Sequence, residues 1–170
     1  GGYMDKAINM ADEFIPDNPM IVYTKGKESR YNAEHHAKIK GAFESGRLGV
    51  RIDAGSASAS EIVSGAIQDN DRGLIIGRRS FGKGLVQEQY TLSDGSALRL
   101  TTARYYTPLG RSIQKPYDKD HYKYQMEVLS RMHQGEKYIN DTSIKNQSTF
   151  LMKNIMLMKI LIYLSLIKLN

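Results

Sequence analysis

The apolar residues of this chain recur with two different periods, and the alternation between these periods limits the folds open to it. Short apolar runs predict strands at 20–24, 48–53, 74–76 and 85–92, and helical spacing predicts helices over 4–15 and 59–67. A Ser-Asp-Gly-Ser turn at 93–96 leads into an alternating strand over 97–105. Strands that alternate with helices and end in a hairpin predict an α/β fold with a mixed sheet.

The composition is that of a globular domain, and it narrows the possible chemistry. With 170 residues, 41% of them apolar, the chain is long enough for one domain, or most of one, with a buried core. It has no cysteine, and its four histidines lack metal-site spacing, so we expect no metal site and no cofactor. The net charge of +6 is dispersed, with only Arg78 and Arg79 adjacent, so we expect no nucleic-acid partner.

The chain divides into three parts. Residues 1–117 hold the strand and helix patterns and form the expected core, in which the polar, aperiodic stretch 25–47 is a surface excursion. Residues 118–147 are polar and predict a helical extension. Residues 148–170 are strongly apolar, but lysines interrupt them too often for a membrane span of about 20 residues. This tail stays open as a membrane anchor through 150–169, a buried element or the product of a damaged reading frame.

The stretch IIGRRSFGKGLVQ, residues 75–87, is close to a phosphate-binding loop. Such a loop needs an entering strand, a Ser or Thr after the lysine for Mg²⁺, and a helix whose N-terminus faces the phosphates. Here Gly84 occupies the Ser/Thr position, and the residues after it alternate as a strand does. Nucleotide binding is therefore only a remote alternative.

The other interpretation is that Lys83 is a catalytic base. Its free pKa of about 10.4 means that the neutral form costs about 4–5 kcal/mol at pH 7, and burial can lower a lysine pKa by up to about 3–5 units. A nucleophile could come from the serine-rich turn at 55–61, because helix N-termini stabilise negative charge. The same residues form a capping box, S-x-x-E, and spacing alone leaves Ser56, Ser58 and Ser60 open.

Two motifs, SASASE at 56–61 and FGKGLVQ at 81–87, occur in this order within a longer run over 55–117. Together they resemble the C-terminal processing, or tail-specific, peptidases, which are serine proteases with a Ser/Lys dyad. The opening GGYMDKAINMADEFIP resembles the helix that follows the Gly-rich loop of this family. The resemblance therefore covers roughly residues 1–117.

This resemblance implies a crotonase- or Clp-protease-like core of ββα units, truncated in this chain. It implies a serine endopeptidase that cleaves polypeptides near an apolar C-terminus, in the periplasm or cell envelope. The family's PDZ domain, which captures the C-terminus of the substrate, has no counterpart here, and no signal peptide precedes Gly1, so we expect a fragment. The alternative is an inactive fragment on the same fold that binds an extended peptide by β-augmentation.

The resemblance also assigns roles to individual residues. It implies that Ser58 is the nucleophile and Lys83 the general base, and that Gln87 orients the lysine. On one strand, positions 83 and 87 would face the same side. The backbone N–H groups of Ala59 and Gly2 would form the oxyanion hole.

Two charged residues carry further expectations. Asp69 lies eleven residues after Ser58, about 16 Å along a helix, so we exclude it from the dyad and expect it to pair with Arg72. Arg51 lies in a strand that the resemblance expects to be buried, where an unpaired charge costs several kcal/mol. It must therefore reach solvent or a carboxylate, or else strain the strand.

Overall fold

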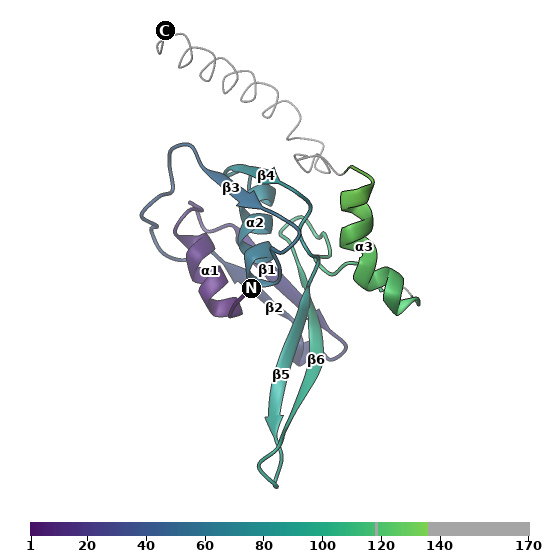
Figure 1. Cartoon of the computed structure of the whole chain (residues 1–170). Helices are drawn as coiled ribbons and strands as arrows, with labels where there is room; N and C mark the ends of the chain where they lie inside the picture. Colours follow the sequence, from purple (N-terminus) through teal and green to yellow (C-terminus); the bar gives the residue numbers. More distant parts are fainter. Residues whose placement is uncertain (118, 136–170) are drawn as a thin grey trace. The chain divides into compact units, whose positions relative to one another are not determined.

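The computed structural model describes residues 1–117 and 119–135, which belong to one compact unit (Figure 1). The elements in chain order are α1 (Met4–Asp12), β1 (Met20–Gly26), the 3₁₀ helix η1 (Ser29–Tyr31), β2 (Ala33–His36), β3 (Gly49–Ile52), α2 (Ala59–Asp69), β4 (Leu74–Gly77), β5 (Leu85–Thr91), β6 (Ala97–Tyr106) and α3 (His121–His133). The predicted α/β class is confirmed.

The strands form two sheets that differ in the direction of pairing. β2, β1, β6 and β5 make an antiparallel sheet in that order, and β3 pairs with β4 in parallel. Helix α2 makes the crossover between β3 and β4, as a parallel pair requires. The carboxyl ends of β3 and β4 therefore lie at the same edge, where the loops that follow them can meet.

Helices α1 and α2 pack against each other and against β1, and this contact forms the core. The buried side chains of this core come from the predicted helical stripes and from the sheet and include Ala7, Ala11, Ile15, Ile21, Val22, Ile62 and Ala66. Alanines at the helix contact allow the two backbones to approach closely, and each buried isoleucine contributes about 1.5–3 kcal/mol. This packing fixes the orientation of α2 and hence of the residues at its N-terminus.

The polar stretch 25–47 is more regular than its sequence suggests. It contains η1 and β2, and β2 pairs with β1 at the edge of the sheet. Beyond β2, the guanidinium of Arg72 donates hydrogen bonds to the carbonyl oxygens of Phe14, Phe43 and Gly46 at 2.6, 2.8 and 3.0 Å. Arg72 thus binds the excursion to the end of α1.

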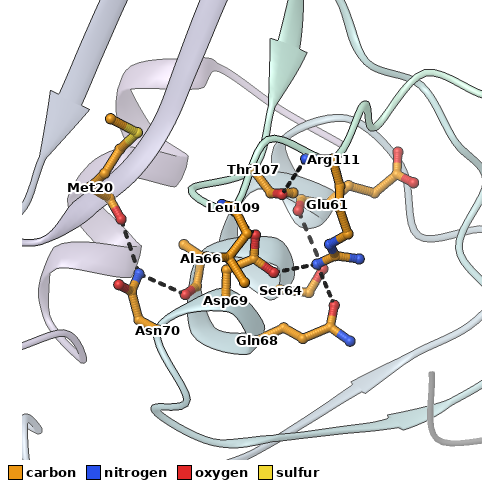
Figure 2. A network of polar contacts seen from close by, with 10 residues as sticks. All are labelled: Met20, Glu61, Ser64, Ala66, Gln68, Asp69, Asn70, Thr107, Leu109 and Arg111. Carbon is orange, nitrogen blue, oxygen red and sulfur yellow. Dashed lines mark hydrogen bonds and ion pairs between the residues drawn. The ribbon is translucent and has the colours of Figure 1, made fainter. Parts of the chain in front are cut away.

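The expected pairing of Asp69 with Arg72 is wrong. The carboxylate of Asp69 is fully buried, forms an ion pair with Arg111 and accepts the backbone N–H of Leu109 at 2.9 Å (Figure 2). The cause is tertiary, because the turn after β6 passes the C-terminal end of α2 while backbone carbonyls surround Arg72. Asp69 and Ser58 lie at opposite ends of α2, so Asp69 stays outside the dyad.

Arg51 reaches solvent. β3 pairs only with β4 among the described residues, and along it Val50 and Ile52 are partly covered while Arg51 is exposed. No helix within the described ranges is long and apolar enough to cross a bilayer. The predicted apolar tail, 148–170, lies outside these ranges.

The Asp69 contact gives a first prediction. Asp69→Asn should lower the free energy of unfolding by about 1–3 kcal/mol, because it removes the charge from a buried, charge-assisted contact with Arg111. Asp71→Asn is the matched control. Asp71 is exposed with a φ of 51°, which Asn tolerates well, so a change below about 0.5 kcal/mol is expected. Equal losses for the two variants in urea denaturation would contradict the assignment.

Candidate active site

Ser58 occupies the last position before α2, and its backbone is strained. The residue has a φ of 57° and a ψ of −112°, a region that favours glycine. Such a conformation costs on the order of 1–3 kcal/mol, persists only where surrounding contacts enforce it, and clusters at functional sites. The turn that contains Ser58 follows β3, so it lies at the carboxyl edge of the parallel pair.

The loop that carries Lys83 follows β4 and lies beside the serine turn. Its backbone N–H groups at Arg78 and Phe81 donate to the carbonyl oxygens of Ile52 and Ser56, at 3.1 and 2.9 Å. The two motifs of the sequence thus meet because they follow neighbouring parallel strands.

One carboxylate joins the two motifs. Glu61, in the first turn of α2, is buried and accepts the backbone N–H groups of Ser58, Gly82 and Lys83 at 2.8, 2.7 and 2.8 Å. The bonds to Ser58 and Lys83 end on the same oxygen, so their amide nitrogens lie within twice 2.8 Å of each other. The sequence indicated Glu61 only as a capping residue; its contact with the lysine loop was missed, and S-x-x-E was the only signal.

The two predicted oxyanion donors also lie at the serine turn. A Cβ atom placed on Gly2 would be 3.7 Å from the Cβ of Ala59, and one placed on Gly1 would be 4.0 Å from the Cβ of Ser58. Within the described residues, the N–H groups of Ala59 and Gly2 donate no hydrogen bond.

Hydrogen bonds to Glu61 link the backbones of Ser58 and Lys83, but within the described residues no such contact links the side chains of the expected dyad. Lys83 is exposed, so the described residues do not supply the shielding from water that we expected. It precedes β5, which begins at Leu85, so strand periodicity does not orient it relative to Gln87, which is exposed on β5. Across residues 1–117 and 119–135, no hydrogen bond joins the side chains of Ser58, Lys83 and Gln87.

The lysine loop does not have the geometry of a phosphate cradle. The N–H groups of Gly82 and Lys83, which would bind phosphate, already donate to the carboxylate of Glu61. A phosphate there would face a negative charge, and β5 rather than a helix follows the loop. Within the described ranges, no cluster of three His, Cys, Asp or Glu side chains could hold a metal ion.

Comparison with known proteins identifies the family of this chain. The family model for peptidase family S41 matches residues 1–123. The carboxy-terminal-processing protease of Bartonella bacilliformis is 48% identical over 114 residues, which are 67% of this chain and 26% of that protease. The chloroplastic C-terminal processing peptidase of Tetradesmus obliquus is 41% identical over 117 residues, 68% of this chain and 24% of that enzyme.

Solved structures show the same relation. The photosystem II D1 C-terminal processing protease superposes with a TM-score of 0.60 at 37% identity, over 71% of this chain and 31% of that one. A putative S41 protease from Bacteroides fragilis, at 15% identity, shares the fold with a TM-score of 0.54 over 91% of this chain and 42% of its own. The chain spans about a quarter of the length of the curated relatives, for example 26% of the Bartonella protease. On the family match and these relatives, the chain belongs to peptidase family S41.

Proposed function

We propose that this chain carries the nucleophile and the general base of a serine peptidase that cleaves polypeptides near an apolar C-terminus. The observation that carries the proposal is the shared carboxylate of Glu61, which holds the backbones of Ser58 and Lys83 side by side. The strained backbone of Ser58 and the family membership support it. The processing peptidases among the relatives support an extracytoplasmic location, such as the periplasm or cell envelope.

The proposed acylation step uses Ser58, Lys83, Ala59 and Gly2. The Oγ of Ser58 attacks the carbonyl carbon of the scissile bond while its proton passes to the neutral amine of Lys83. The oxyanion that forms accepts the N–H groups of Ala59 and Gly2, at the N-terminus of α2. Collapse of this intermediate breaks the C–N bond, and the ammonium of Lys83 returns its proton to the leaving amine.

Deacylation repeats the sequence with water. Water gives a proton to Lys83 and attacks the ester carbon; Ser58 then leaves and recovers its proton from the lysine. Both steps need an uncharged Lys83, and its side chain is exposed here. We propose that the bound substrate excludes water from the amine.

A second candidate function is peptide binding without turnover. The exposure of Lys83 favours it, because general-base catalysis by a lysine needs an amine that is shielded from water. Among the described strands, β5 lies at an edge of the antiparallel sheet and begins two residues after Lys83, so an extended peptide could pair with it. Peptide binding with no cleavage by the parent chain would favour this candidate.

Cleavage of a fluorescence-quenched, unstructured peptide with apolar C-terminal residues tests the dyad. Ser58→Ala should reduce cleavage to background, and Lys83→Met should lower kcat by about 10²–10⁴ because the base is lost. Lys40→Met, at another exposed lysine, should leave the rate unchanged. If the parent cleaves and both site variants cleave equally well, the assignment is wrong.

The strain at Ser58 makes a separate prediction about stability. Ser58→Gly should abolish cleavage yet raise the free energy of unfolding by about 1 kcal/mol, since glycine relieves about 1–3 kcal/mol of strain and costs about 0.5–1 kcal/mol of chain entropy. Ser60→Gly lies within α2, where φ is helical, and should instead lower stability by about 0.5 kcal/mol. Thermal or urea denaturation measures both, and a loss of stability in Ser58→Gly would count against a strained nucleophile.

A further inference from the structure

A second set of contacts holds the loop around Lys83, and it comes from the segment after β6. The backbone N–H of Lys115 donates to the carbonyl oxygen of Gly82 at 2.9 Å, and the N–H of Gly84 donates to the Oε1 of Gln114 at 3.0 Å. Glu61 accepts the N–H groups of Gly82 and Lys83. Hydrogen bonds to Glu61 on one side and to Gln114 and Lys115 on the other thus hold the backbone around Lys83.

This contact explains why glycine stands on both sides of Lys83. A Cβ atom on Gly82 would lie 2.8 Å from the Cβ of Lys115, and one on Gly84 would overlap the backbone nitrogen of Gln114. Gly82 also has a φ of 87°. The glycines of F-G-K-G therefore admit the segment 113–115 against the loop, where a phosphate loop would admit its ligand.

Gln114 and Lys115 are buried polar residues, and α3 contacts both, although the Nε2 of Gln114 also donates to the carbonyl oxygen of Lys115 at 3.0 Å. The Nε2 of Gln114 and the hydroxyl of Tyr124 are 3.3 Å apart, and the Nζ of Lys115 donates to the carbonyl oxygen of Tyr124 at 3.1 Å. The Nζ also lies 3.9 Å from the centroid of the Tyr124 ring and 5.0 Å from that of Phe81. Glu127, one turn further along α3, places its carboxylate 3.6 Å from the same ammonium.

A buried ammonium is costly unless its surroundings replace water, and here α3 supplies the carbonyl oxygen and ring of Tyr124 and the carboxylate of Glu127. The backbone N–H of Lys115 in turn binds the carbonyl of Gly82, and the side chain of Gln114 binds the N–H of Gly84. We propose that Tyr124 of α3 is a positioning residue for Lys83, acting through Gln114 and Lys115. Helix α3 then helps to hold the loop that carries Lys83. Its catalytic consequence rests on the proposed function; the structural link does not.

Amide hydrogen exchange followed by NMR tests the structural link without any need for activity. Tyr124→Ala should raise the exchange rate of the Gly84 amide about tenfold or more, the size expected when a hydrogen bond and a cation–π contact are lost. Tyr124→Phe, which keeps the ring, should fall between this variant and the parent. Tyr122→Ala is the matched control on the same helix, where the tyrosine is 70% exposed, and should change nothing.

An unchanged Gly84 exchange rate in Tyr124→Ala would overturn the proposal. If that variant unfolds, Lys115→Met decides the matter in its place: faster exchange at Gly84, with exchange in β1 unchanged, supports the link, and unchanged exchange refutes it. Where the parent cleaves peptide, Tyr124→Ala should lower kcat about tenfold with little change in KM, and Tyr124→Phe should recover most of it. Faster exchange with an unaltered kcat would refute the positioning role, whereas faster exchange in an inactive parent refutes only the proposed function.

Discussion

The buried carboxylate of Glu61 is the contact on which the rest of the site depends. A charge inside a protein is tolerated only when hydrogen bonds replace its water, and here three backbone N–H groups do so. These groups come from two loops, so neither loop can move away without leaving the carboxylate partly unpaired. The core packing of α1 against α2 fixes the helix that carries Glu61. The position of both motifs thus follows from the hydrophobic core.

The backbone of the site is held in conformations that an unconstrained chain would avoid. Ser58 has a glycine-like φ, and the loop around Lys83 needs glycine at 82 and 84 to lie against the segment 113–115. Strain of this kind has to be offset by surrounding contacts. Those contacts come from α2 on one hand and from Gln114 and Lys115, supported by α3, on the other. A site built in this way positions a nucleophile and a base mainly through their main chains.

Local sequence patterns predicted many of the helices and strands, but they did not predict the long-range contacts between side chains. The helical stripe that includes Ile62 predicted α2 and its buried face, because a 3.6-residue period is a property of the segment itself. The resemblance that the two motifs carry implied that the serine turn and the lysine loop form one site. Pairing of Asp69 with Arg111 instead of Arg72 depends on which turn passes the end of α2, and the exposure of Lys83 depends on what covers the loop. Neither this pairing nor this exposure can be predicted from the spacing of residues along the sequence.

The most direct test of the account is the rate at which a fluorophosphonate probe modifies the chain, with the modified residue identified by mass spectrometry. The account predicts that Ser58 is labelled in preference to the other serines, and that Glu61→Gln slows labelling at least about tenfold while circular dichroism shows a folded chain. Glu44→Gln, which alters a carboxylate that accepts a single N–H, should not slow it. Labelling at another serine, or an unchanged rate in folded Glu61→Gln, would contradict the claim that this carboxylate assembles the site.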